Sequence, residues 1–142
     1  MPVRKADAVW NGTLREGTGR VSLESGAFEG KYSFGSRFES EPGTNPEELV
    51  GAAHAGCFSM ALSAALGEAG HDPLEVATTA RVHLEKTDDG FAVTRIELVS
   101  RAKVPGIDRD TFMTFAEDAK QGCPISKLLT GAEISLQIEL EN

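Results

Sequence analysis

The chain contains two cysteines, and their surroundings in the sequence differ. Cys57 lies inside the apolar stretch HAGCFSMALSAAL, residues 54–66, and Cys123 lies in QGCPISKLL, residues 121–129. A cysteine reacts as its thiolate, which a nearby cation, a metal or a helix N-terminus stabilises. Two neighbouring cysteines can also cycle between a dithiol and a disulfide. Cys57 is therefore either a small buried residue or a reactive thiol with Cys123 as its partner.

Taken alone, Cys57 is typical of a structural cysteine. It falls about three turns into an expected helix, where the helix dipole has little effect. Burial would raise the pKa of its thiol, and no Lys or Arg lies within one helical turn of it. A reactive Cys57 would therefore need a cation from another part of the protein.

Cys123 occupies the opposite kind of position. We expect it at the N-cap of a short helix, with Pro124 at the first helical position. Unpaired N–H groups and the positive end of the helix dipole lower the pKa of a thiol placed there. On these grounds Cys123 is the better thiolate, although Cys-Pro could also simply start a helix.

The long apolar helix has clear ends in the sequence. Asn45 is a good N-cap, Pro46 fits the first helical position, and Glu48 falls at N3, where it would complete a capping box. We expect the helix to run to about Ala69 and to stop at Gly70, a length of roughly 36 Å. It is apolar on several faces, and the sheet of one small monomer can cover only one of them. We therefore predict a homodimer in which a second chain covers the rest.

The other elements follow from alternation and turn residues. A hairpin is expected over residues 75–104 with TDDG as its turn, and a helix follows, with Asp108 or Asp110 as N-cap and Gly122 at its end. Strands are also predicted at KADAVW (5–10), GRVSLE (19–24), YSFGSRFE (32–39) and AEISLQIEL (132–140). Strands and helices are grouped, which indicates an α+β fold with mostly antiparallel sheet and a single domain over residues 1–142.

Charge limits the partners. The chain has 14 Lys and Arg against 22 Asp and Glu, a net charge of −8, so nucleic acid and anionic membrane surfaces are disfavoured. Residues 49–66 carry no formal charge and are just long enough to span a bilayer, but they are rich in Ala, Gly and Ser, and we interpret them as a buried core helix. The start, MPVRKADAVW, has no apolar signal core, so we expect a cytoplasmic protein.

Two segments together resemble the OsmC/Ohr family of thiol peroxidases. They are GTNPEELVGAAHAGCFSMALS and AKQGCPISKLL, and VSLESGAF, GSRFE and GEAG place the chain nearer the osmotically inducible OsmC branch than the Ohr branch. The resemblance spans essentially the whole chain. It implies an OsmC-like fold in which antiparallel sheets wrap around long central helices in an intertwined homodimer.

The resemblance also assigns roles to four residues. It implies Cys57 as the peroxidatic cysteine and Cys123 as the resolving cysteine. Arg37, in GSRFE, matches the family's active-site arginine, which pairs with a carboxylate from NPEE; without the resemblance it would be an ordinary surface strand residue. We assign that carboxylate to Glu47, ten residues before Cys57, because Glu48 already has a place in the capping box.

The implied function is the reduction of organic hydroperoxides, and of hydrogen peroxide, through a Cys57 sulfenic acid and a Cys57–Cys123 disulfide. A dithiol would reduce the disulfide, and no cofactor or metal is implied. The alternative function is a non-enzymatic dimeric stress protein, or one that binds a small ligand, with inert buried cysteines. Two chemical alternatives use His54, three residues before Cys57: a metal site with Cys57 and perhaps Cys123, His71 or His83, or Cys-His nucleophilic catalysis.

Overall fold

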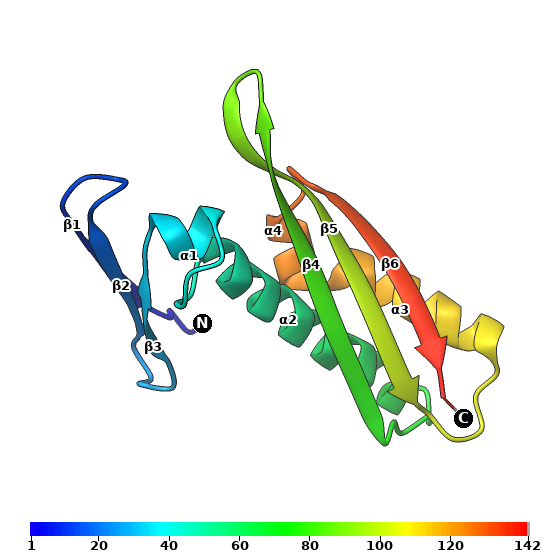
Figure 1. Cartoon of the computed structure of the whole chain (residues 1–142). Helices are drawn as coiled ribbons and strands as arrows, with labels where there is room; N and C mark the ends of the chain where they lie inside the picture. The colour runs from blue at the N-terminus through cyan, green and yellow to red at the C-terminus, as the bar shows by residue number, and fades with distance from the viewer. Residues whose placement is uncertain (142) are drawn as a thin grey trace. The chain divides into compact units, whose positions relative to one another are not determined.

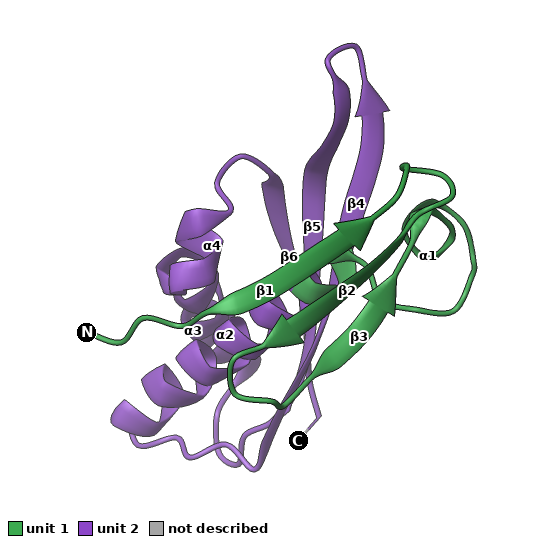
Figure 2. Cartoon of the chain, turned by 90° about the vertical axis from the view of Figure 1, so that its left-hand side faces the viewer, with its two compact units in different colours: residues 1–49 green, residues 50–142 purple. Residues whose placement is uncertain are grey.

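A computed structural model describes residues 1–141 of the chain. In chain order its elements are β1 (Ala6–Asn11), β2 (Thr18–Leu23), β3 (Glu29–Tyr32), α1 (Phe34–Phe38), α2 (Pro46–Glu68), β4 (Glu75–Thr87), β5 (Gly90–Lys103), α3 (Arg109–Gly122), α4 (Pro124–Leu128) and β6 (Glu133–Leu140) (Figure 1). They form two compact units, Met1–Leu49 and Val50–Asn142 (Figure 2). The α+β class is confirmed, and the prediction of a single domain stays a prediction.

The first unit is a three-stranded antiparallel sheet, β1-β2-β3, followed by α1. The strand expected over residues 32–39 is wrong beyond Tyr32, because the chain turns there into α1. Ser33 and Ser36 cause the turn through a reciprocal cap. The Ser33 hydroxyl accepts the N–H of Ser36 at 3.1 Å, and the Ser36 hydroxyl accepts the N–H of Ser33 at 2.8 Å.

Helix α2 begins and ends nearly where the sequence predicts. The N–H of Glu48 donates to the Asn45 side chain at 2.7 Å, so the N-cap is confirmed. The expected return contact of the capping box is wrong, because the Glu48 carboxylate instead accepts from the Thr44 hydroxyl at 2.7 Å. The helix ends at Glu68, and Gly70 follows with φ +85°, a conformation that glycine adopts without a steric penalty.

The second unit is a sheet with helices on one face (Figures 1 and 2). Strands β4 and β5 form the expected antiparallel hairpin, with a register shift between His83 and Leu84. The sheets are mostly antiparallel, as predicted, and β6 is the exception because it pairs parallel to β5. The cause is the crossover through α3 and α4, which returns the chain to the same end of the sheet.

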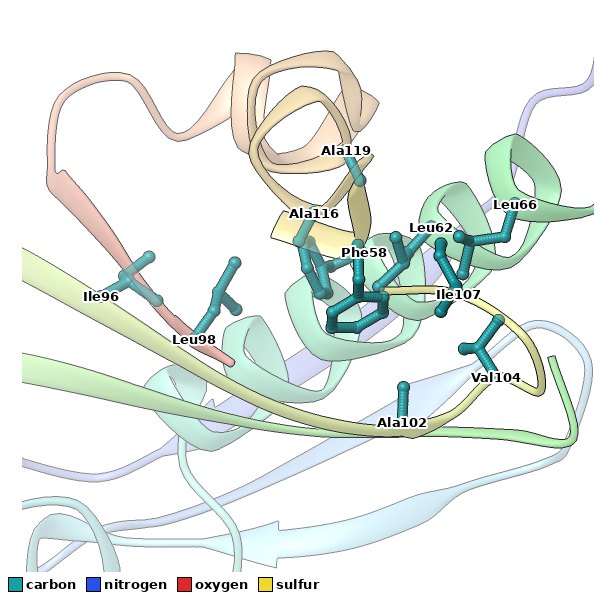
Figure 3. Close-up of a cluster of buried hydrophobic side chains, with 11 residues drawn as sticks. Phe58, Leu62, Leu66, Ile96, Leu98, Ala102, Val104, Ile107, Ala116 and Ala119 are labelled. Carbon is teal, nitrogen blue, oxygen red and sulfur yellow. The ribbon is translucent and has the colours of Figure 1, made fainter. Parts of the chain in front are cut away.

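The core of the second unit lies between this sheet and its helices. Side chains of α2, α3 and β5 converge there on one cluster (Figure 3). Phe58, Leu62 and Leu66 of α2 are fully buried, at the spacing of four residues that places them on one face of the helix. This packing fixes the rotation of α2, and with it the direction in which Cys57 points.

The rest of α2 has less cover within one chain. Between the exposed Glu48 and Glu68 at its ends, the exposed residues of α2 are apolar or small: Ala52, Ala53, Gly56, Met60 and Ala64. Met60 keeps 76% of its surface exposed. Within the described residues, α2 is the one helix long and apolar enough to cross a membrane by length and composition, a test that the core helix of a soluble protein also passes. The homodimer predicted from this helix stays a prediction.

Candidate active site

The second unit brings the two cysteines together. Their Sγ atoms lie 2.6 Å apart, although the residues are 66 positions apart in the sequence. Both cysteines are free thiols, and the S–S bond of a disulfide is about 2.05 Å long. Cys57 is half-buried and Cys123 is fully buried. A small displacement of either sulfur would therefore allow a disulfide to form.

Two helix ends hold Cys123 in this place. Its N–H donates to the carbonyl of Ala119 at 3.0 Å and closes α3, while Pro124 occupies the first position of α4. Cys123 is thus both the C-cap of α3 and the N-cap of α4, and its predicted N-cap position is confirmed. Its thiol faces α2 at the level of Cys57 because α3 packs on the same core as α2.

The environment of Cys57 disfavours its thiolate. Burial raises the pKa of the Cys57 thiol, and its hydrogen bond with Cys123 raises the pKa further. The N–H of Ile125, in the first turn of α4, opposes both effects and lowers the pKa, but by less. The residues of the second unit alone therefore keep Cys57 protonated, and the need for an outside cation remains.

The environment of Cys123 has the opposite effect. Burial alone would raise the pKa of its thiol, but the hydrogen bond with Cys57 and the contributions of Ser126 and Ile125 together lower it below its ordinary value. Ser126 contributes through both its N–H and its hydroxyl. Within this unit Cys123 is thus the more acidic of the two thiols, in the direction that the sequence predicts.

The first unit supplies a cation bound to a carboxylate. Arg37 donates from Nε to Oε1 of Glu47 at 3.0 Å and from Nη2 to Oε2 at 2.8 Å. This bidentate contact fixes the plane of the guanidinium. Glu47 lies in the first turn of α2, where the helix dipole favours a carboxylate. Glu48 bonds to Thr44, so the carboxylate that pairs with Arg37 is Glu47.

Polar contacts of the preceding loop hold α1 against the start of α2. The Ser36 hydroxyl donates to the carbonyl of Thr44 at 2.7 Å, and the Asn45 side chain donates to the carbonyl of Ser36 at 3.1 Å. Thr44 is tied in turn to β3, because its N–H donates to the carbonyl of Lys31 at 2.8 Å. Arg37 and Glu47 meet because these contacts fold residues 39–45 back on the sheet.

A cavity of about 370 Å³ opens beside Arg37 in the first unit. Most of its wall is apolar or aromatic: Trp10, Gly12, Leu14, Tyr32, Ser33, Phe34, Arg37 and Phe38 line it. The cavity can accept an apolar group, and Arg37 is the charged residue of its lining.

His54 does not have the surroundings of a metal ligand or a catalytic base. It is fully buried, and its Nε2 lies 2.7 Å from the Ser126 hydroxyl. Burial lowers the pKa of its imidazole, which favours the neutral form. Within residues 1–141, no group of three or more His, Cys, Asp or Glu could hold a metal ion.

Sequence reasoning missed two contacts at the thiols. These are the approach of the Ile125 N–H to Cys57 and the hydrogen bond between His54 and Ser126. A signal for the second was present, because His54 precedes Cys57 by three residues and Ser126 follows Cys123 by three. Residues three apart lie on one helix face. If the two cysteines are neighbours in the fold, His54 and Ser126 should therefore also be neighbours.

Two thiols 2.6 Å apart in an α+β fold can interconvert between a dithiol and a disulfide. Residues 38–139 match the family described as OsmC-like protein. The chain belongs to this family. The match includes Glu47, Cys57 and Cys123, and it begins one residue after Arg37.

Individual relatives agree with the family match. The chain is 54% identical over 140 residues to the peroxiredoxin OsmC of Escherichia coli strain K12, which covers 98% of this chain and 97% of the relative. It is 37% identical over 93 residues to an organic hydroperoxide resistance protein of Xanthomonas axonopodis pv. citri, a match that covers 63% of this chain and 61% of the relative. The higher identity agrees with the predicted OsmC branch.

A solved structure agrees on the fold. The crystal structure of an OsmC-like protein from Mycoplasma pneumoniae superimposes with a TM-score of 0.78 over 99% of each chain, at 15% identity. At this identity the match shows the fold alone. The OsmC-like fold predicted from the sequence is confirmed.

Proposed function

We propose that the protein is a cysteine peroxidase that reduces organic hydroperoxides and hydrogen peroxide. The observation that carries the proposal is the 2.6 Å separation of the Cys57 and Cys123 sulfurs, because it places a second thiol where it can trap an oxidised first one. The names peroxiredoxin and organic hydroperoxide resistance protein, carried by the relatives, support the same activity.

The proposed cycle uses Cys57 first. Its thiolate attacks the terminal oxygen of the hydroperoxide, the O–O bond breaks, and the alcohol leaves after taking a proton. Cys57 becomes a sulfenic acid. The thiolate of Cys123 then attacks the Cys57 sulfur, the S–O bond breaks, and water leaves. An external dithiol reduces the resulting disulfide, and the acidity of Cys123 makes it a good leaving group in that step.

Arg37 supplies the charge that Cys57 lacks. A guanidinium stays protonated when buried and can contact a thiolate and a carboxylate together. In this proposal Arg37 lowers the pKa of Cys57 and polarises the O–O bond, while Glu47 holds the guanidinium plane. The apolar part of an organic hydroperoxide would occupy the 370 Å³ cavity beside Arg37.

A homodimer would bring these parts together. Glu47 and Cys57 are ten residues apart on α2, a rise of about 15 Å along the helix. We place the Arg37–Glu47 pair of one chain at Cys57 of the other, with the exposed small and apolar residues of α2 in the interface. A single domain over residues 1–142 in each chain and a cytoplasmic location, where thiols stay reduced, complete the proposal.

Dithiol-coupled reduction of an organic hydroperoxide tests the proposal. Wild-type protein should sustain turnover, and Cys57→Ser should reduce it by at least about a thousandfold. Cys123→Ser should still undergo the first oxidation but should stall before the disulfide. Full turnover by Cys57→Ser would overturn the assignment. Two slow thiols that never react with peroxide would instead favour a non-enzymatic protein with inert cysteines.

A further inference from the structure

The buried hydrogen bond between His54 and Ser126 has no part in the cycle described above. His54 has no exposed surface, Ser126 is 4% exposed, and Nε2 and Oγ are 2.7 Å apart. The other ring nitrogen, Nδ1, is buried without a hydrogen-bond partner among the described residues. An unpaired buried polar atom is destabilising, and an apolar side chain would avoid that cost. Stability alone therefore does not explain an imidazole at this position.

The position of this hydrogen bond suggests its use. His54 lies on α2 one turn before Cys57, and Ser126 lies on α4 one turn after Cys123. The hydrogen bond therefore joins the same two helices as the contact between the sulfurs, about one turn away from it. The two contacts together fix both the separation and the rotation of α4 relative to α2.

Helix α4 buries little of its own surface. It has five residues, no side-chain cap, and Ser126 is its one buried residue. Leu128, in its last turn, keeps 74% of its surface exposed. The C-cap of α3 holds the backbone of Cys123, and the directional bond at Ser126 adds a second fixed point on α4.

We propose that the hydrogen bond between His54 and Ser126 is a positioning contact that sets how fast, and how completely, Cys123 closes the disulfide on Cys57. The kinetic half of this inference rests on the proposed peroxidase function. The equilibrium half rests only on the two thiols and can be tested without peroxide.

The chemistry of closure explains why position matters. The Cys123 thiolate must approach the Cys57 sulfur opposite its oxygen; the S–S bond forms as the S–O bond breaks, and hydroxide leaves and takes a proton to become water. The peroxide has already supplied the oxidising equivalents, so no other oxidant is needed. The Ser126 hydroxyl, oriented by His54, is among the groups that lower the pKa of Cys123. Losing that orientation should slow closure without changing the attack of Cys57 on peroxide.

Four variants separate positioning from general stability. Ser126→Ala and His54→Leu remove the hydrogen bond, whereas Ser126→Thr and His54→Gln keep a group that can form it. Ser100→Ala is the matched control, because Ser100 is a fully buried hydroxyl of β5 that bonds to Thr78, within the sheet. All the variants are compared at a temperature where thermal melting shows them folded.

Single-turnover reaction with an organic hydroperoxide measures the kinetics. Dimedone trapping of the sulfenic acid, with alkylation of remaining thiols, gives separate rates for Cys57 oxidation and disulfide closure. Ser126→Ala and His54→Leu should slow disulfide closure on the order of tenfold, the effect expected from loss of one hydrogen bond. The rate of Cys57 oxidation should stay within about twofold of the wild-type rate. Ser126→Thr and His54→Gln should recover most of the loss, and Ser100→Ala should close at the wild-type rate.

A glutathione equilibrium provides the second measurement. The ratio of disulfide to dithiol at fixed glutathione ratios should fall by a similar factor in Ser126→Ala and not in Ser100→Ala. Wild-type closure and equilibrium in both Ser126→Ala and His54→Leu would overturn the inference. If the wild-type protein does not react with peroxide, the proposed function fails. The glutathione equilibrium then still tests the positioning role. A shifted equilibrium in Ser126→Ala supports that role, and an unshifted equilibrium overturns it.

Discussion

The two parts of the proposed site are held by different kinds of contact. In the first unit, Arg37 and Glu47 are joined by two charge-assisted hydrogen bonds, and the arginine side chain keeps 35% of its surface exposed. In the second unit, the cysteines lie among packed helices, and Cys123 is fully buried. Packing fixes the thiols, whereas the charge that we propose activates Cys57 is held by a partly solvated ion pair.

In the proposed mechanism, neither unit is complete alone. Burial raises the pKa of Cys57, whereas hydrogen bonds with Cys57, Ser126 and Ile125 lower the pKa of Cys123. In the proposal, a cation beside Cys57 would reverse that order, and a partly solvated ion pair would supply the cation without the large penalty of burying an isolated charge. The predictions below separate the contribution of the charge from that of the packing.

Removal of the Arg37 charge should have the largest effect among these predictions. Arg37→Ala should slow oxidation of Cys57 by hydroperoxide at pH 7 by about a hundredfold to a thousandfold, as expected for loss of one charged group at a reacting centre. Arg20→Ala is the matched control, because Arg20 also forms an exposed ion pair, with Glu29, in the same unit. Equal loss in the two variants would contradict the role of Arg37.

The pH dependence of Cys57 oxidation in Arg37→Ala is a second test of the role of Arg37. The reactive form is the thiolate, and burial raises the pKa of Cys57 above its ordinary value. Without the guanidinium, the thiolate forms only as the pH rises through that raised pKa, so the rate should climb through the alkaline range. Stopped-flow oxidation across pH would show this, with the wild-type rate levelling at lower pH.

Mixing inactive chains tests whether the charge and the thiol come from different subunits. Arg37→Ala and Cys57→Ser proteins should each be inactive, but a refolded equal mixture should recover about a quarter of wild-type turnover, because half of the dimers would carry one intact site of two. The two variants mixed without subunit exchange are the control. A refolded mixture with no activity would show that both residues must belong to one chain.

Loss of the Glu47 charge should have a smaller effect. Glu47→Gln keeps the shape of the side chain but weakens the bidentate grip on Arg37, and turnover should fall by about tenfold. Glu29→Gln makes the same change in the ion pair with Arg20 and should leave turnover unaltered. Steady-state assays of both variants measure the difference. Equal turnover by Glu47→Gln and Glu29→Gln would contradict a role for Glu47 in the site.

The smallest effect concerns acid stability at His54. Burial lowers the pKa of its imidazole in the folded state, so the unfolded chain binds the proton more readily. The stability that the neutral imidazole contributes is present above the unfolded pKa of about 6.5 and is lost as the pH falls below it. Urea unfolding should show a steeper loss of stability below pH 6.5 in wild type than in His54→Leu; identical pH dependence would contradict a buried neutral His54.

Local signals in the sequence predicted most of the elements. Asn45 and Pro46 marked the start of α2, and TDDG marked the turn of the β4–β5 hairpin, because these residues act through their own backbone geometry. The same kind of reasoning failed over residues 32–39. There the alternation suggested a strand, but the reciprocal cap between Ser33 and Ser36 started a helix instead.

The site was less accessible to sequence reasoning because it depends on distant contacts. Pro124 correctly marked Cys123 as a helix N-cap, but nothing local brings Cys123 to Cys57. Arg37 and Glu47 were singled out by family resemblance alone, and their contact depends on the folding of residues 39–45. The parallel pairing of β6 likewise follows from the path of α3 and α4 and not from its own sequence pattern.

Mass spectrometry of the native protein, before and after one equivalent of an organic hydroperoxide, tests the central claim most directly. Free thiols are alkylated, and the protein is then digested without reduction. We predict the loss of two hydrogen atoms and a joined peptide pair that carries Cys57 and Cys123. Two alkylated, unoxidised cysteines after the treatment would contradict the account and would leave the residues around Cys57 as a core helix without redox function.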